Sequence, residues 1–496
     1  MAKLSGSGMS APIPHTRIQF CNDAAINPQG KFVLYWMIAS RRPGWNFALQ
    51  QAVNQALALD KPLVILEALR INYPWASDRF HRFVMDGMCD HIQHFKHYPV
   101  CYYPYVERRI GEGRGLLSTL AVEACLIVTD DFPCFFLPRM VQAAAKKLGV
   151  QLQAVDSNGL LPMRAAKDTF KTAYSFRRFL QNNLHTHLAV FPQSNPLEGI
   201  RLPRFNMPEV ITQRWPCIDK DALKRDTGLQ SQLDINHAVA HSEGIGGFSA
   251  GLQRVRTFLD SKLNAYEEHH NHPDKEASSH LSPWLHFGHV SSHFIFAEIA
   301  GNAGWSLEQA HTRGNGSKRG WWKLPSSTEA FLDELVTWRE LGFNMCATTP
   351  DYDQYESLPQ WAKSTLAQHG SDKRAHLYTL NEFEAAQTHD PVWNAAQRQL
   401  IVDGYIHNYM RMLWGKKIVE WSTSPELALS IMLELNNKYA LDGRDPNSYS
   451  GIFWVLGRYD RPWGPERPIF GKVRYMSSAS TLRKLRLKEY LHRYRG

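Results

Sequence analysis

The sequence predicts an N-terminal α/β domain with a doubly wound parallel sheet, joined by a long linker to an all-helical C-terminal domain. Short apolar runs of strand length alternate with helical stretches in the first third of the chain, an arrangement typical of a parallel sheet. A proline-rich segment follows, and beyond it the strand signal fades while helical periodicity continues. The 496 residues, 44% of them hydrophobic, are enough for two or three domains.

These observations set the expected domain borders. We expect a flexible N-terminal tail over 1–19, a Rossmann-like α/β domain over 20–187, a linker over 188–234 and a helical domain over 235–496. In the α/β domain, the predicted strands are KFVLYWMI, PLVILEAL, ACLIVTDD and VQLQAVD, and the predicted helices are NFALQQAVNQALALD and LPRMVQAAAKKLG. The glycine-rich GEGRG, Gly111 to Gly115, lacks the spacing and the preceding strand of a dinucleotide fingerprint, so it predicts a turn that opens a helix.

Composition limits the classes of function. A formal charge of +9 favours a polyanionic partner and is compatible with binding to phosphate groups. The seven cysteines form no CxxC pair, which indicates free thiols in a reducing compartment and argues against an iron–sulfur cluster. No apolar run approaches the roughly 20 residues that span a bilayer, and no secretory signal is visible. We therefore expect a protein that is neither secreted nor bound to a membrane.

The segment from Trp393 to Trp463 is unusually rich in tryptophan. Steps of three and four residues trace one helical face through Tyr405, Tyr409, Met412 and Lys416. Trp414 and Trp421 are seven residues apart, roughly 10 Å along a helix axis, so a third ring would have to lie between them to pass an electron. Trp393 is the candidate for that ring. Such a helix is more often plain core, but the polar loop LDGRDPNSY that follows needs partners if it is buried.

Three long C-terminal motifs, MRMLW, LNNKYALDGRDPNSYSGIFW and RPIFGKVRYM, resemble the class II cyclobutane pyrimidine dimer photolyases of the photolyase/cryptochrome superfamily. The resemblance extends upstream through FLDELVTWREL, LPQWAKSTLAQH and LSPWLHFGHVSSHF and covers most of the chain. It implies a carbon–carbon lyase that repairs damaged DNA in blue light. In such enzymes excited reduced FAD, FADH−, gives an electron to a flipped-out dimer, and the electron returns after the cyclobutane bonds break.

The resemblance also implies the flavin site. Serines ahead of Pro283 are typical of helix capping and also of phosphate binding, and the residues alone favour capping. In the family a similar segment cradles the FAD pyrophosphate, an asparagine lies near flavin N5, and an arginine and an aspartate pair beside the flavin. The residues implied to bind FAD are Tyr266, Ser278, Ser279, His280, Leu281, Ser282, Arg339, Arg411, Asn436, Asp442 and Asp445.

The lesion site is implied in the same way. Glu334 and Trp338 are four residues apart and so share a helical face, which ordinarily means only a half-buried helix. The resemblance implies that Glu334 hydrogen-bonds the base edge of the dimer, that Trp338 and Trp454 form apolar walls around the dimer, and that Met412 faces it.

Two further sets of residues are implied by the resemblance. The tryptophan relay that reduces oxidised FAD in light would run from Trp414, nearest the flavin, through Trp393 to a solvent-exposed Trp421. The basic loop after Trp454 would contact DNA and fill the gap left by the flipped dimer, although such a loop is often merely solvated. Its implied DNA-binding residues, in addition to Trp338 and Trp454, are Arg461, Lys472 and Arg474.

Two groups of histidines raise the question of a metal. The first, which could share one helix face, is His286, His289 and His293; the second is Glu267, Glu268, His269, His270 and His272. The first lacks an evident carboxylate partner and the second is typical of a solvated loop, so we expect no metal site.

Several alternatives remain open at this point. A cryptochrome-like blue-light photoreceptor would keep FAD and the tryptophans without repair, a (6-4) photoproduct photolyase would act on another lesion, and a non-catalytic DNA-binding protein would explain only the charge. We expect damaged DNA as the partner, a monomer, and a cytoplasmic (nucleoid) or nuclear location depending on the organism. An antenna chromophore of the 8-hydroxy-deazaflavin or folate type is also implied for the α/β domain.

Overall fold

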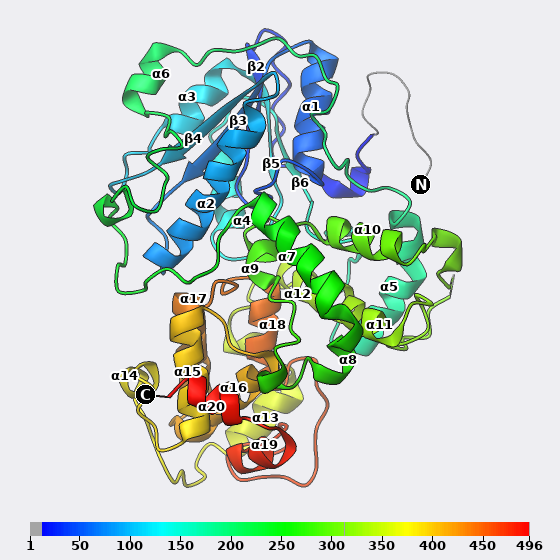
Figure 1. Ribbon diagram of the computed structural model, residues 1–496, viewed down its shortest axis with the longest axis vertical. Coiled ribbons are helices and arrows are strands. Elements are labelled where there is room, and N and C mark those ends of the chain that lie inside the picture. The colour runs from blue at the N-terminus through cyan, green and yellow to red at the C-terminus, as the bar shows by residue number, and fades with distance from the viewer. Residues whose placement is uncertain (1–11, 312, 496) are drawn as a thin grey trace. The chain divides into compact units, whose positions relative to one another are not determined.

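The computed structural model describes residues 12–311 and 313–495, and their contacts divide the chain into two compact units (Figure 1). Unit 1 comprises Met1–Ala165, Thr186–Arg254 and Trp284–Gly301, and unit 2 comprises Ala166–His185, Val255–Pro283 and Asn302–Gly496. The division is not linear in sequence, unlike the predicted borders. The predicted linker 188–234 lies inside unit 1, and the segment 166–185 belongs to unit 2.

Unit 1 is built on a sheet whose six described strands have the order β1-β6-β5-β2-β3-β4. All neighbours are parallel except β1, which is antiparallel to β6. The strands are β1 (Ile18–Phe20), β2 (Phe32–Trp36), β3 (Leu63–Leu69), β4 (Val100–Val106), β5 (Ala124–Asp130) and β6 (Leu152–Val155). The predicted doubly wound sheet is therefore confirmed. Of the predicted tail, 1–11 lies outside the described residues, whereas Ile18 and Gln19 are already part of β1.

The central strands are buried on both faces, which explains their continuous apolar runs. Every residue of β2 is buried, and so is every residue of β5. The edge strand β4 contains Pro104, and its polar tyrosines interrupt the apolar pattern, so it was not among the predicted strands. A proline is tolerated there because an edge strand leaves one row of N–H groups unpaired.

Helices connect the strands of unit 1. They are α1 (Phe47–Leu59), α2 (Asp78–Phe95), α3 (Leu116–Glu123) and α4 (Leu137–Ala145). Later segments of the unit contribute α6 (Glu209–Arg214), α7 (Phe248–Ser261), α9 (Ser282–His286) and α10 (Ser292–Asn302). Of these, α7, α9 and α10 extend beyond the borders of the unit. The side chain of Asn46 caps α1 by accepting hydrogen bonds from the N–H groups of Ala48 and Leu49. The main core lies where α1 and the end of α2 pack on one face of the sheet. GEGRG precedes α3, as predicted.

The carboxyl end of the sheet is filled by polar side chains of the chain itself. The chain order reverses between β2 and β5, the place where open α/β sheets usually bind a ligand. There Asp130 Oδ2 accepts the N–H groups of Ile38, Ala39 and Ser40 at 2.8, 2.8 and 3.0 Å. Three successive N–H groups are a typical anion-binding nest. A carboxylate of the chain occupies this one, so it is not open to a nucleotide phosphate.

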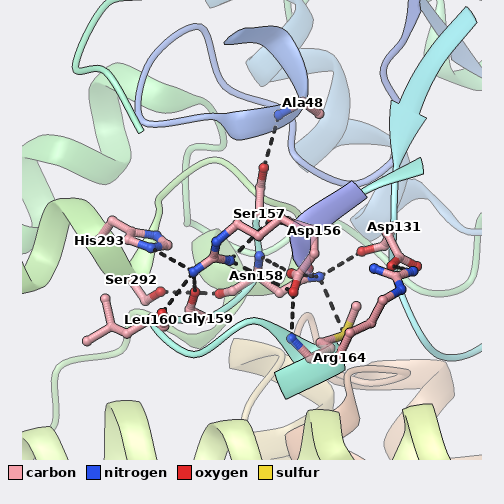
Figure 2. A network of polar contacts seen from close by, with 12 residues as sticks. Ala48, Asp131, Asp156, Ser157, Asn158, Gly159, Leu160, Arg164, Ser292 and His293 are labelled. Carbon is pink, nitrogen blue, oxygen red and sulfur yellow. Dashed lines mark hydrogen bonds and ion pairs between the residues drawn. The ribbon is translucent and has the colours of Figure 1, made fainter. Parts of the chain in front are cut away.

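A second network fixes the loop after β6 (Figure 2). Asn158 donates to the carbonyl of Asp131 at 2.7 Å and its own carbonyl accepts the Ser292 hydroxyl at 3.2 Å. Asp131 also pairs with Arg164 at 2.5 Å. These contacts join α10 to the sheet, which explains why residues near 292 belong to unit 1 although they lie in the predicted helical domain.

Unit 2 is predominantly helical, as predicted. Its elements are α5 (Ala173–His187), α8 (Tyr266–His269), α11 (Ser326–Leu332), a π-helix (Asp333–Trp338), α12 (Arg339–Thr348), α13 (Gln360–Gln368), α14 (Leu380–Glu384), α15 (Pro391–Asp403), α16 (Asn408–Trp421), α17 (Pro425–Tyr439), α18 (Pro446–Val455), α19 (Ser478–Lys484) and α20 (Lys488–Arg493), of which α5 reaches two residues past the unit. No helix among the described residues is long and apolar enough to cross a membrane.

The helix that was predicted to include Tyr405 begins after this residue. Gly404 ends α15 in the left-handed conformation, with φ 76°, and α16 begins at Asn408. Tyr405 therefore lies between the helices, and its predicted place on the face of Tyr409, Met412 and Lys416 was wrong.

Candidate active site

The candidate lesion residues Glu334 and Trp338 lie on the π-helix Asp333–Trp338, between α11 and α12. Short π-helical segments are rare and occur frequently at functional sites. The ring of Trp338 stacks on that of Trp454 from α18, with centroids 4.6 Å apart and planes 20° apart. Both tryptophans are half-buried, and the indole N–H of Trp454 is buried without a hydrogen-bond partner in the described part of the chain. The pair thus leaves part of an aromatic surface accessible, beside a buried donor that no described residue satisfies.

The side chain of Glu334 is only partly exposed. Burial, followed by the negative charge of neighbouring Asp333, raises the pKa of Glu334 to about 7, although Lys318 and Arg177 act in the opposite direction. Arg177 holds Asp333 with two hydrogen bonds, of 2.6 and 2.9 Å. Near neutral pH a large fraction of Glu334 is therefore protonated and can donate a hydrogen bond.

Met412 and Lys416 lie one turn apart on α16. Met412 is half-buried, while Lys416 is buried and donates to the carbonyl of Val455 at 2.5 Å, at the end of the helix that carries Trp454. Burial lowers the pKa of Lys416 to about 7. The sequence did not suggest this contact, by which Lys416 ties α16 to α18 and so helps to position Trp454.

The predicted flavin residues Arg411, Asn436 and Asp442 lie on α16, on α17 and in the loop after α17. Arg411 and Asp442 form an ion pair of 3.3 Å, with both side chains largely buried. The side-chain amide of Asn436 donates to Ser448 Oγ at 2.9 Å and to Asn437 Oδ1 at 3.2 Å. This leaves its side-chain carbonyl oxygen without a hydrogen bond from any described residue.

Two other predicted FAD ligands have local structural tasks. Asp445 caps α18 by accepting the N–H of Asn447 at 2.9 Å. The guanidinium of Arg339 lies 4.5 Å from the centre of the Phe343 ring. Both side chains are buried, so any contact that they make with FAD would come in addition to these contacts.

The predicted pyrophosphate segment borders a cavity. Ser278 and His280 line it, and its volume of about 230 Å³ is room for several water molecules or a polar part of a ligand. His280 has a left-handed backbone, with φ 54°, and the centroid of its ring lies 4.6 Å from that of Tyr405. Leu281 is buried and Ser282 begins α9, a helix of five residues. The other lining residues are Pro273, Asp274, Glu276, Gln399, Tyr405, His407, Glu489, Tyr490, His492, Arg493 and Tyr494.

Tyr266 packs against other aromatic rings, and the first histidine group does not lie on one helix as predicted. The ring of Tyr266 stacks on His270 at 4.6 Å and packs against Phe331. His286 lies in α9, His289 in the following loop and His293 in α10, so the three do not share a helix and that prediction was wrong. Within residues 12–311 and 313–495 no group of three or more potential ligands is placed to hold a metal ion.

The three tryptophans of the predicted relay are all buried. The rings of Trp393 and Trp421 are 6.1 Å apart, and the indole N–H of Trp393 donates to the carbonyl of Trp414 at 3.0 Å. Trp421 is only 3% exposed, so its predicted contact with solvent was wrong. Half-buried Tyr378 and exposed His389 cover it, with ring centroids 5.6 and 5.0 Å from its own.

The predicted DNA-contacting loop after α18 combines exposed cations with an aromatic ring. The guanidinium groups of Arg461 and Arg474 lie 5.2 and 5.3 Å from the centre of the Trp463 ring. Lys472 is exposed and pairs with Glu466 at 3.3 Å. Such a mixture of basic and aromatic groups is typical of surfaces that bind nucleic acid.

Comparison with known structures shows the fold. A bacterial class III photolyase from Agrobacterium tumefaciens aligns over 99% of this chain and 88% of its own, with a TM-score of 0.64 and 15% identity. A cryptochrome of Synechocystis aligns over 93% and 88%, with a TM-score of 0.61 and 14% identity. At these identities the two structures establish the architecture and leave the activity to other evidence.

Comparison of sequences establishes the family, although no family model matches the chain. The deoxyribodipyrimidine photo-lyase of Methanothermobacter thermautotrophicus is 35% identical over 480 residues, which cover 97% of this chain and 98% of that protein. The deoxyribodipyrimidine photo-lyases of Potorous tridactylus and Arabidopsis thaliana are each 31% identical, over 94% and 95% of this chain and 82% and 89% of their own. Similarity at this level through both units means that the chain belongs to the deoxyribodipyrimidine photo-lyase family.

Proposed function

We propose that this protein is a class II photolyase, a lyase that splits cyclobutane pyrimidine dimers in DNA under blue light. The observation that carries the proposal is the position of a carboxyl group with a pKa of about 7, Glu334, on the same π-helix as Trp338, whose ring stacks on Trp454. A full-length relationship to deoxyribodipyrimidine photo-lyases supports the reaction class.

The lesion is recognised by stacking and by hydrogen bonds. A dimer flipped out of the duplex packs its two rings on the aromatic surface of Trp338 and Trp454, and base stacking of this kind contributes roughly 1 to 3 kcal/mol per base. Protonated Glu334 donates a hydrogen bond to a carbonyl oxygen of the dimer. That hydrogen bond strengthens as the dimer takes up negative charge, so it favours the bond-breaking step over binding alone.

The cofactor assignment rests on how the residues fit FAD. Reduced FAD, when bound, supplies the excited electron and receives it back, so that no net oxidation occurs. The Arg411–Asp442 pair would hold the flavin, and the free side-chain carbonyl oxygen of Asn436 can accept the hydrogen of a reduced flavin N5. Ser278 and His280, at the edge of the 230 Å³ cavity, would hold the phosphates.

Trp414, Trp393 and Trp421 would carry electrons inward when the cofactor has become oxidised. Their close contacts and burial support this role, because electron transfer between rings depends on near contact and on shielding from solvent reactions. We also propose an antenna chromophore of the 8-hydroxy-deazaflavin or folate type in the α/β domain, a monomeric state and a place in the compartment that holds the DNA.

A comparison of lesions tests the function. Reduced protein is illuminated with matched oligonucleotides that carry a cyclobutane thymine dimer, a (6-4) photoproduct or no lesion, and the products are separated by chromatography. We expect only the cyclobutane dimer to return to intact thymines. Repair of the (6-4) photoproduct instead, or reduction of FAD by light with no repair of any lesion, would refute the proposal and favour a (6-4) photolyase or a photoreceptor.

A further inference from the structure

We propose that the loop 313–323 is a phosphate clamp that binds the DNA backbone beside the flipped dimer. This inference rests on the proposed function and assigns a DNA-binding segment outside the basic loop that follows α18. The segment reads RGNGSKRGWWK and contains no acidic residue. Its four cations are Arg313, Lys318, Arg319 and Lys323, all of them exposed.

The clamp loop packs against the π-helix that carries Glu334. Lys318 and Trp321 face Asp333 and Thr337 across a cavity of about 10 Å³, room for one water molecule at most. The charge of Lys318 reaches Glu334 and acts to lower its pKa. Lys318, and with it the middle of the loop, is thus held at the edge of the lesion site.

The residue that follows Lys318 contacts the neighbourhood of the predicted flavin residue Tyr266. Arg319 forms an ion pair with Glu267, the residue after Tyr266. Lys318 and Arg319 therefore place the middle of the loop beside both Glu334 and the residue that follows Tyr266.

Buried groups fix the backbone of the clamp loop. Arg177 of α5, which holds Asp333, also donates to the carbonyl of Gly316 at 3.3 Å. Gln181, one turn further along α5, accepts the N–H of Gly316 at 2.9 Å and donates to the carbonyl of Ser317 at 2.8 Å. A buried ion pair and a buried amide are costly to assemble, so they indicate a loop whose conformation matters.

Sterics at Gly316 lead to the same conclusion. Its φ of 78° is left-handed, and a Cβ added there would come within 2.6 Å of the Tyr174 ring. Two buried tryptophans, Trp321 and Trp322, anchor the C-terminal side of the loop. A loop that merely displayed its charges to solvent would need neither the glycine nor these anchors.

The cations themselves are left for a partner. Arg313, Lys318 and Lys323 form no ion pair or hydrogen bond with any described residue, and Arg319 has only Glu267. Their mutual repulsion disfavours this arrangement unless an anion offsets it. Duplex DNA carries one phosphate charge per roughly 1.7 Å of helix axis and so offers such anions to exposed cations. Lysines bind phosphates as point charges without reading bases, which suits an enzyme whose lesion occurs in any sequence.

The test compares two double variants of the full-length protein that remove the same charge. Lys318→Gln/Lys323→Gln alters the clamp loop, and Lys146→Gln/Lys147→Gln alters two exposed lysines at the end of α4. Dark binding to a dimer-containing duplex and to its undamaged counterpart is measured over salt concentrations of about 50 to 200 mM. Because all four lysines are exposed, both variants should have the same melting temperature as the parent protein.

For the clamp variant we expect the slope of log K against log salt to fall by about 2 for both duplexes, at about 0.9 for each phosphate that the protein no longer neutralises. The control variant should keep the parent slope. Equal slopes for the two variants would overturn the inference. The proposed function is tested separately, because the slopes on undamaged DNA do not depend on repair. It fails if the parent protein repairs no dimer.

Discussion

The protonation state of Glu334 gives the sharpest prediction about the chemistry. Burial and the charge of Asp333 raise its pKa to about 7, so the carboxyl donates a hydrogen bond below that pH and becomes an acceptor above it. An ionised carboxylate would repel the negative charge that develops on the dimer. Repair should therefore fall as pH rises through about 7.

The size of the effect follows from the titration. With a pKa of about 7, roughly 90% of Glu334 is protonated at pH 6 and roughly 10% at pH 8, so repair per photon should decline about tenfold between them. Glu334→Gln removes the titration but keeps an N–H donor of similar size. Its repair should be nearly constant over the same interval.

The assay uses chemically reduced protein, saturating dimer oligonucleotide and a fixed dose of blue light at pH values of about 6, 7 and 8, with restored thymines counted. Saturation removes the influence of pH on DNA binding. A flat profile for the parent protein would show that Glu334 is not a proton-bearing donor. An equal decline in Glu334→Gln would trace the pH dependence to another group.

Three further outcomes are expected. Trp414→Phe should slow the reduction of oxidised FAD by light, followed by absorbance, while chemically reduced protein still repairs dimers; photoreduction at the parent rate would remove Trp414 from the relay. Arg177→Ala leaves Asp333 buried and unpaired and should lower the free energy of unfolding by about 3 to 5 kcal/mol, measured by denaturant titration; a decrease under about 1 kcal/mol would contradict the buried pair. The pKa of Lys416 is lowered to about 7 in the folded state, so above that pH the unfolded chain binds the extra proton and stability should rise up to a pH of about 10, relative to Lys416→Met, by roughly 1.4 kcal/mol per pH unit; parallel profiles would show that Lys416 titrates normally.

The parallel sheet could be predicted because its central strands are buried on both faces and read as unbroken apolar runs. The edge strand β4 could not, since Pro104 and its tyrosines hide the pattern that burial imposes elsewhere. The domain borders also escaped local signals. The Ser292–Asn158 contact that places α10 with the sheet joins residues that are 134 positions apart.

Within the site, Glu334 and Trp338 lie on one helical segment, but it is a π-helix, which had no signal in the sequence. The break at Gly404 did have a signal in the sequence, the glycine directly before Tyr405. The helical periodicity of the following residues outweighed that signal in the prediction. Burial of Trp421 depends on Tyr378 and His389, which come from an earlier segment. Spacing along one helix cannot reveal such cover.

The clamp loop shows the same limit. Its cations and glycines are visible in RGNGSKRG, where a run of charge is ordinarily taken as solvated surface. What distinguishes it is the anchoring by Arg177 and Gln181, which lie far earlier in the chain, with sequence separations of 139 and 136 residues from their carbonyl acceptors.

The most direct test of the proposed function is repair of an oligonucleotide with a single thymine dimer by reduced protein, in blue light and in the dark. We expect intact thymines to return only in the light, with Trp338→Ala and Trp454→Ala binding the dimer more weakly than the parent. Conversion in the dark, or tight binding and FAD reduction with no conversion in the light, would contradict it.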